Sequence, residues 1–134
     1  MSESAAHMDL VRKIYEYVGT VVPAHSAALV RIDSPETQRT TNVNGFWPDV
    51  YFQDRDVLII GEAKTEADLL RKHSQEQYAA YVEYCRAFAG QATLVIGVPW
   101  QSAYSARNYF ARINRKGKKI GIAVVTDAGQ VWPS

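Results

Sequence analysis

Residues 47–65 read WPDVYFQDRDVLIIGEAKT, and this stretch decides the fold. Residues 50–52 are β-prone, residues 53–56 are polar, and residues 57–60 form an uninterrupted apolar run that ends at Gly61. Such a run is typical of a central strand that is covered on both faces. The stretch therefore predicts a β-hairpin whose second strand lies inside the sheet.

The predicted hairpin places two acids and a lysine on one face of the sheet. If the four polar residues form the loop, Asp49 lies opposite Ile60. Because side chains alternate along a strand, Glu62 and Lys64 share a face with Asp49. Glu62 is then the diagonal neighbour of Asp49, at roughly 7–8 Å. We expect these two carboxylates to hold a cation between them.

Two carboxylates with no His or Cys beside them in the sequence form a site of hard oxygen ligands. Such ligands favour Mg²⁺ or Mn²⁺ over Zn²⁺. A lysine two residues beyond the second acid can orient an attacking water, help to deprotonate it, or offset charge on a phosphate. The set is typical of phosphodiester hydrolysis. The alternative is a strand-end salt bridge between Lys64 and one of the acids.

The same residues resemble a known signature. Pro48-Asp49, followed at hairpin distance by Glu62-Ala63-Lys64 at the end of an apolar strand, resembles the motif of the PD-(D/E)xK nuclease superfamily. The resemblance implies an α/β fold with a restriction-endonuclease-like core, in which helices flank a central mixed β-sheet. It also implies that Asp49, Glu62 and the Ala63 carbonyl bind the metal and that Lys64 is the catalytic lysine.

A first helix precedes the hairpin. Apolar residues recur at three- and four-residue spacing between residues 10 and 18, which predicts an amphipathic helix that ends near Gly19. In the resembled family a glutamate of this helix often reaches the active site, sometimes as an extra metal ligand. Glu16 matches it by position, and the alternative is a solvated residue.

A second helix, from a capped start at residues 65–68 to about Ala89, carries Gln77 and Tyr81 on one face. These two residues resemble the QxxxY element that some branches of the superfamily place beside the catalytic hairpin. The resemblance gives Gln77 a role in positioning the metal-bound carboxylate or the substrate, with Tyr81 in support. The alternative is a buried polar pair that is bonded to the backbone.

The remaining elements complete the order αβββαβαβ. Residues 27–32 are the expected first strand, residues 93–98 are the next strand after the second helix, residues 100–116 are the last helix, and residues 120–126 are the last strand. We expect residues 131–132 to cover an edge of the core. This order matches the core of the resembled superfamily.

Two regions are candidates for contact with nucleic acid. The long polar connection at residues 33–46 offers Arg39 and Asn42 to phosphates beside the metal site; alternatively, it becomes ordered only with substrate or in a dimer. The last helix and its exit carry six cations with no acid between them: Arg107, Arg112, Arg115, Lys116, Lys118 and Lys119. With the neighbouring aromatic residues, they suit backbone contacts and base stacking. Stabilisation of helix C-termini is the alternative for some of them.

Composition and length indicate one globular domain. The chain has 134 residues, of which 47% are apolar and 22% charged. We expect a single nuclease domain at residues 8–134, after a disordered or tag-derived stretch at residues 1–7. No apolar run is long enough for a membrane span, and no signal sequence is recognisable, so we expect a cytoplasmic protein. The single cysteine, Cys85, excludes an internal disulfide and a cysteine-cluster metal site.

The charge is unevenly distributed. Residues 1–83 carry 13 acids and 8 bases, whereas residues 84–134 carry 1 acid and 7 bases. The first part contains the expected metal site, and the second suits a phosphate backbone. A bare core of this size resembles Holliday junction resolvases and virus-type replication-repair nucleases, which implies a homodimer that acts on structured DNA, also within a larger nucleoprotein assembly. A non-catalytic nucleic-acid-binding or assembly subunit and an RNA nuclease are the alternatives.

Overall fold

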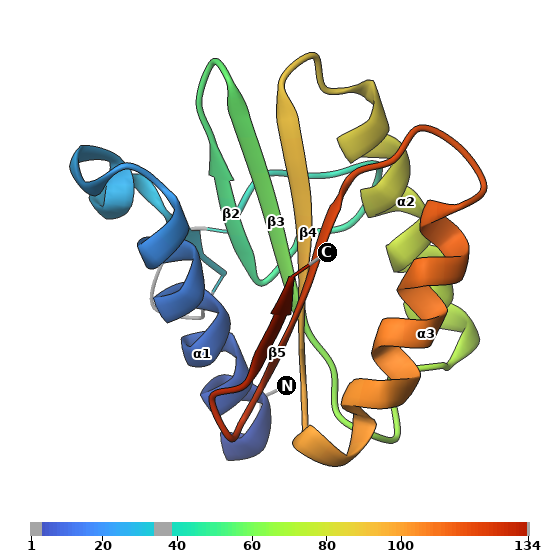
Figure 1. Ribbon diagram of the computed structural model, residues 1–134. Coiled ribbons are helices and arrows are strands. Elements are labelled where there is room, and N and C mark those ends of the chain that lie inside the picture. The colour runs from blue at the N-terminus through green and yellow to red at the C-terminus, as the bar shows by residue number, and fades with distance from the viewer. Residues whose placement is uncertain (1–3, 34–38, 134) are drawn as a thin grey trace.

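The computed structural model describes residues 4–33 and 39–133. Within this part, three α-helices, two 3₁₀ helices and one six-stranded sheet form a layered α/β structure (Figure 1). The elements in chain order are α1 (Ala5–Val21), η1 (Ala24–Leu29), β1 (Arg31–Ile32), β2 (Val50–Gln53), β3 (Val57–Ala63), α2 (Lys72–Ala87), β4 (Gln91–Val98), η2 (Trp100–Ser102), α3 (Ala103–Asn114), β5 (Gly121–Thr126) and β6 (Val131–Pro133).

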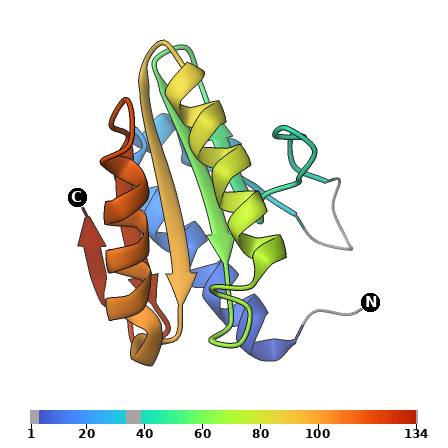
Figure 2. The same ribbon diagram turned by 90° about the vertical axis from the view of Figure 1, so that its right-hand side faces the viewer.

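The sheet is mixed and its strands follow one another in chain order. β1, β2 and β3 are antiparallel neighbours, β3, β4 and β5 are parallel, and β6 returns antiparallel to β5. Helix α1 lies on one face, and α2 and α3 lie on the other (Figures 1 and 2). The expected α/β architecture with a mixed sheet between helices is therefore confirmed. The residues expected to cover a core edge form a sixth strand.

Each face of the sheet has its own apolar core. On the first face, the apolar stripe of α1 packs against alternate residues of β2 to β5; on the second, α2 and α3 pack against the other set of side chains. Gly61 of β3 and Gly97 of β4 bring α1 close to the sheet, because a Cβ atom on either would lie 2.6 or 2.8 Å from the Ile14 side chain. No described helix is long and apolar enough to cross a bilayer.

The hairpin register is shifted by two residues from the expected one, because the turn is centred one residue later in the chain. Asp54 N–H donates to the Val57 carbonyl at 2.9 Å, and the Asp54 carboxylate accepts the N–H groups of Asp56 and Val57. This side chain tightens the loop to two central residues, so Gln53 pairs with Leu58. The expectation that Asp49 lies opposite Ile60 is wrong, since Ile60 pairs with Tyr51.

Two expectations near the N-terminus are corrected. The expected strand at residues 27–32 is shorter, because η1 extends to Leu29 and only Arg31–Ile32 are in the sheet. Pro23 starts this 3₁₀ turn by accepting the N–H of Ser26, and alanines favour strands weakly. Residues 5–7, expected within a disordered or tag-derived stretch, form the first turn of α1, where the Ser4 side chain accepts the His7 N–H.

Candidate active site

The candidate site lies where β3 ends, at the carboxyl edge of the parallel strands. Val50 pairs with Gly61, so one further step along the ladder brings Asp49 level with Glu62. The two side chains are direct rather than diagonal neighbours, on the face that α2 covers. Lys64 N–H donates to the Gly97 carbonyl at 2.8 Å, which continues the β3–β4 pairing through the lysine.

Asp49 is held by groups from two other elements. Its Oδ2 accepts the Ala63 N–H at 2.9 Å, which ties the start of β2 to the end of β3. The Nε2 atom of His7, in the first turn of α1, lies 3.3 Å from the same oxygen. His7 was not predicted at the site because residues 1–7 were expected to be disordered or tag-derived. The helical spacing between His7 and Leu10 was the signal available.

Glu62 is buried and ionisable at the centre of the site. Its Oε1 accepts the Tyr81 hydroxyl at 3.0 Å, and its Oε2 lies 3.6 Å from Lys64 Nζ. Burial, and then the charge of Asp49, raise the pKa of Glu62 well above its ordinary value, while Lys64 and Tyr81 act in the opposite direction. Two buried carboxylates repel each other when both are ionised, so a bound cation would stabilise the pair.

Lys64 is fixed by α2 as well as by the strand. Its Nζ donates to Gln77 Oε1 and faces Glu62 Oε2, so the ammonium lies between an amide and a carboxylate. Gln77 and Tyr81 are one helical turn apart, and each contacts a different member of the Glu62–Lys64 pair. The structure thus brings together both residues of the expected QxxxY element and both residues of the strand end.

Tyr81 itself is held by an aromatic neighbour. The Phe46 and Tyr81 rings are packed edge to face, with their centroids 6.3 Å apart, and Tyr81 is fully buried. Burial, followed by the charge of Glu62, raises the pKa of Tyr81 far above its ordinary value. The phenol therefore stays protonated and can donate to the Glu62 carboxylate.

The expectation of a site with no histidine nearby is wrong, because α1 brings His7 Nε2 to 3.3 Å from Asp49 Oδ2. The oxygen donors of the site fit a hard cation with few protein ligands. Asp49 and Glu62 bring two carboxylates together, and the Ala63 carbonyl belongs to the same strand end. Within residues 4–33 and 39–133 no group of three or more His, Cys, Asp and Glu side chains could hold a metal. Two carboxylates suit an ion such as Mg²⁺, which is held by one or two carboxylates and keeps most of its waters or takes substrate oxygens.

The structure does not bring Glu16 to this site. Glu16 is exposed on α1, nine residues after the His7 that contacts Asp49. Nine residues of α-helix turn by about 180° and rise by about 13 Å. Glu16 thus points away from the site. It is a solvated residue, which was the alternative to a role as an extra metal ligand.

The six expected cations are spread along α3 and its exit. Arg107 lies in the second turn of α3, whereas Arg115, Lys116, Lys118 and Lys119 lie at its exit, before β5 and far from the carboxyl edge (Figure 1). Lys118 Nζ lies 3.3 and 3.4 Å from the carbonyls of Arg86 and Phe88 at the end of α2. Lys118 therefore stabilises a helix C-terminus, which was the alternative for some of these charges.

Arg112 lies in the last turn of α3, and its guanidinium is 6.0 Å from the Tyr109 ring. Arg112 is exposed there, so it faces solvent on the α3 side of the molecule.

The described part of the 33–46 connection is folded against α2. Val43 pairs with Phe46 around a turn with Asn44 and Gly45 at positive φ, and Asn42 Oδ1 accepts the Gly45 N–H at 3.0 Å. Asn42 thus has a structural bond in the turn. Arg39 stacks on the Trp47 ring at 4.5 Å, two residues before Asp49. Residues 34–38 of this connection lie outside the described part.

Comparisons of the chain with protein-family models, with curated proteins and with solved structures found no match.

Proposed function

We propose that the protein is a Mg²⁺- or Mn²⁺-dependent endodeoxyribonuclease of the PD-(D/E)xK type, with Asp49, Glu62 and Lys64 at its active site. One observation carries the proposal. The two carboxylates and the lysine meet at one strand end, and Glu62 and Lys64 are each oriented by a separate side chain of α2. A surface cluster of charges has no need for such support.

The topology supports a restriction-endonuclease-like core. One helix is followed by three antiparallel strands, a helix, and a fourth strand parallel to the third. The resemblance implies this order, and it also implies that the acid-rich hairpin is strands two and three. The proposed site occupies that hairpin.

The residues divide the chemistry between them. Asp49 and Glu62 would hold the metal, with the Ala63 carbonyl as a third oxygen donor. When bound, Mg²⁺ or Mn²⁺ supplies an acidified water and offsets charge on the scissile phosphate. Lys64 orients the attacking water and adds positive charge beside the phosphate. Tyr81 fixes the carboxylate of Glu62, and Gln77 fixes the ammonium of Lys64.

DNA is the proposed substrate because residues 84–134, which carry 7 bases and 1 acid, complement a phosphate backbone. Arg107 and Arg112 are exposed on α3, and Arg39 is exposed beside the hairpin. A homodimer with two such sites would cut two strands, and branched DNA is the structured substrate that suits it.

Cleavage of a labelled panel tests this proposal. The panel contains a four-way junction, a flap, linear duplex, single strand and a supercoiled circle, each with Mg²⁺, Mn²⁺ or EDTA, and wild type is compared with Glu62→Ala. We expect metal-dependent cutting that the variant lacks, and opening of the circle would establish endonucleolytic cutting. Cutting of matched RNA instead of DNA would indicate an RNA nuclease.

A non-catalytic nucleic-acid-binding or assembly subunit is the second candidate. The burial of the site favours it, since Asp49, Glu62 and Lys64 are only 5–8% exposed and could form a structural ion cluster. Binding without cutting on every member of the panel, with either metal, would support this candidate.

A further inference from the structure

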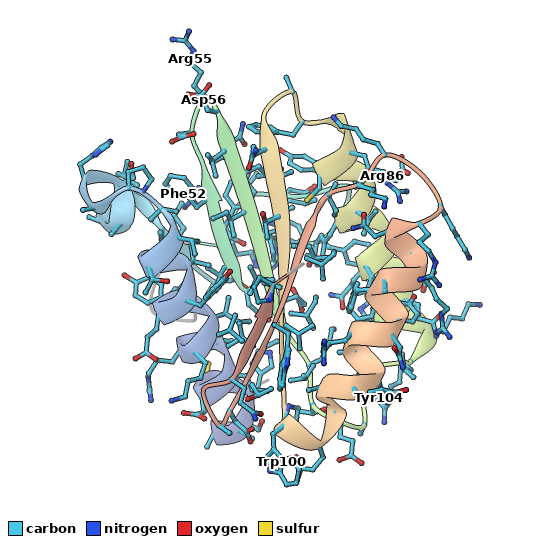
Figure 3. All side chains as sticks on the ribbon, in the orientation of Figure 1. Phe52, Arg55, Asp56, Arg86, Trp100 and Tyr104 are labelled. Carbon is cyan, nitrogen blue, oxygen red and sulfur yellow. The ribbon has the colours of Figure 1, made fainter. Side chains whose placement is uncertain are left out.

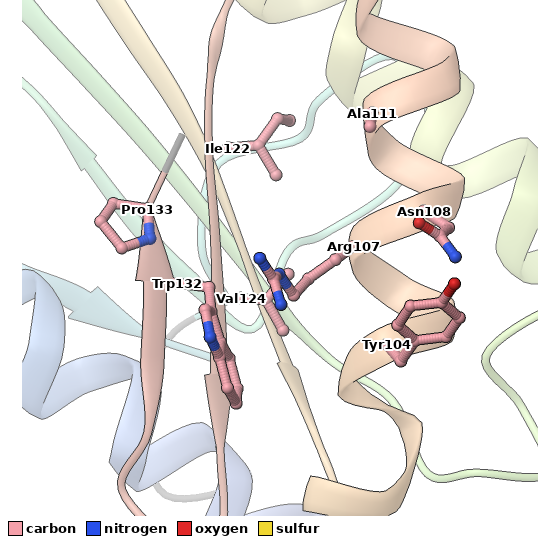
Figure 4. Close-up of a pocket in the computed structure, with 8 residues that line it drawn as sticks. All are labelled: Tyr104, Arg107, Asn108, Ala111, Ile122, Val124, Trp132 and Pro133. Carbon is pink, nitrogen blue, oxygen red and sulfur yellow. The ribbon is translucent and has the colours of Figure 1, made fainter.

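We propose that the substrate carries unpaired nucleotides and that a cavity between α3 and β5–β6 holds one of their bases. The inference rests on the proposed function for its choice of DNA, but it concerns a separate part of the molecule. Figure 4 shows the cavity, which has a volume of about 270 Å³. It is lined by Tyr104, Arg107, Asn108, Ala111, Ile122, Val124, Trp132 and Pro133.

The lining has the chemistry that a nucleotide needs. Trp132 and Tyr104 offer aromatic surfaces to a base, and the Asn108 amide offers a donor and an acceptor to a base edge. The Arg107 guanidinium reaches from α3 to the Trp132 ring at 5.1 Å, as Figure 4 shows. No acidic side chain of the described residues pairs with Arg107, so its N–H groups can bind a phosphate.

The size favours one nucleotide over a larger ligand. Pockets for drug-sized molecules begin at roughly 300 Å³, slightly more than this cavity provides. The exposure of Tyr104 also favours binding of a base. Its side chain is 75% exposed, whereas a tyrosine that packs in the core of a protein is largely buried, so the ring is accessible to a ligand.

The sheet register fixes the position of the cavity relative to the active site. Glu62 pairs with Ile96, Ile96 with Val124, and Val124 with Trp132, so all four lie in one row across the sheet. Glu62 and Trp132 are three strands apart, which corresponds to about 14 Å. A stacked strand needs at least about four nucleotides to cover that distance, at roughly 3.4 Å per step.

A nucleic-acid strand must pass around the rim of the sheet, because α3 covers Ile96 and Val124. Trp100 stands on this rim. It follows the carboxyl end of β4 and is 58% exposed, and its backbone N–H donates to Asp127 Oδ1 at 2.9 Å. Figure 3 shows Trp100 at the tip of the molecule and Tyr104 along α3, so aromatic surfaces lead from the strand ends toward the cavity.

Paired bases cannot use these surfaces. In a duplex each base is stacked on its neighbours and its edge is paired, so it reaches a stacking platform only when it is unpaired. The inference therefore predicts preference for flaps, tails, branch points or single strands over blunt duplex.

Fluorescence anisotropy in EDTA tests the inference without cleavage. The ligands are a blunt duplex and the same duplex with a single-stranded oligothymidylate tail. We expect wild type to bind the tailed duplex more tightly. Tyr104→Ala and Arg107→Ala, both at exposed positions, should each weaken binding of the tailed duplex, Tyr104→Ala by about 5- to 140-fold, with blunt duplex unaffected by Tyr104→Ala.

Tyr15→Ala is the matched control, since Tyr15 is a partly exposed tyrosine of α1 on the opposite face of the sheet. Equal affinity of wild type for both ligands, or equal loss for both in Tyr104→Ala, would overturn the inference and leave the nuclease proposal intact. Tail binding through Tyr104 in a protein that never cuts would support the cavity and overturn the nuclease proposal.

Discussion

Tyr81 donates its hydroxyl to Glu62 Oε1 at 3.0 Å, and this bond joins the middle of α2 to the end of β3. Both residues are buried, and the raised pKa of Tyr81 keeps the phenol protonated. One turn earlier, Gln77 accepts from Lys64 Nζ. The helix thus orients both members of the Glu62–Lys64 pair, and its side chains can be tested one at a time.

Tyr81→Phe removes this bond and little else. Because the buried carboxylate then lacks one hydrogen-bond donor, the free energy of unfolding should fall by about 1–3 kcal/mol. Loss of an outer hydrogen bond should also weaken metal binding by about 10- to 100-fold. Urea denaturation and Mn²⁺ titration measure the two effects. Tyr15→Phe, on the opposite face, is the control, and a Tyr81→Phe protein with unchanged stability and metal affinity would contradict the role of the bond.

Glu62→Gln should raise stability at neutral pH while it abolishes cleavage. The pKa of Glu62 is higher in the native state than its ordinary value of 4.5, so the native state holds the proton more tightly than the unfolded chain does. The proton on Glu62 stabilises the native state fully below pH 4.5, and this stabilisation is lost as pH rises through the raised pKa. The glutamine side chain does not ionise, so the variant does not lose stability in this way. The stability difference between variant and wild type should therefore grow as pH rises.

Urea denaturation without metal across this pH range measures the difference. Glu76→Gln, which removes the charge of an exposed glutamate of α2, is the matched control. If Glu62→Gln is less stable than wild type at neutral pH, the ionised carboxylate stabilises the fold as an ion-pair partner. That result would contradict the view that its charge destabilises the metal-free protein.

Gly61→Ala should destabilise the fold through α1. The added Cβ would lie 2.6 Å from Ile14 Cγ2, inside the core that α1 forms with the sheet. Overpacking of this kind costs about 1–3 kcal/mol. Gly19→Ala is the control: it lies in α1 with nothing within 4 Å of the added atom, and it should stabilise by about 0.5–1 kcal/mol. Thermal unfolding compares the two, and equal effects would rule out a close helix–sheet contact at Gly61.

The sequence predicted the hairpin and its shared face because these depend on local patterns. The alternation of side chains places Asp49 and Glu62 on one face for either loop, since the two registers differ by two residues and an even shift keeps every side chain on its face. Which register forms depends on Asp54, whose carboxylate accepts two backbone N–H groups of the turn. Such a side-chain bond is not visible in hydrophobic periodicity.

Long-range contacts were less accessible. The His7–Asp49 contact joins residues that are 42 positions apart, and it forms only when α1 packs across the sheet. The bonds of Lys118 to the end of α2 likewise require the tertiary fold, so a run of cations could not separate a helix-capping lysine from a phosphate ligand. The row of residues from Glu62 to Trp132 likewise could not be predicted, because it depends on the register of three strand pairs.

Cleavage of a supercoiled circle by Lys64→Ala in Mg²⁺ tests the central claim most directly, with the exposed Lys72→Ala of α2 as the matched control. The site predicts that Lys64→Ala cuts at least about 100-fold more slowly than wild type, that DNA binding in EDTA is retained, and that Lys72→Ala cuts normally. Cutting by Lys64→Ala at the wild-type rate would contradict the assignment of this lysine and of the site built around it.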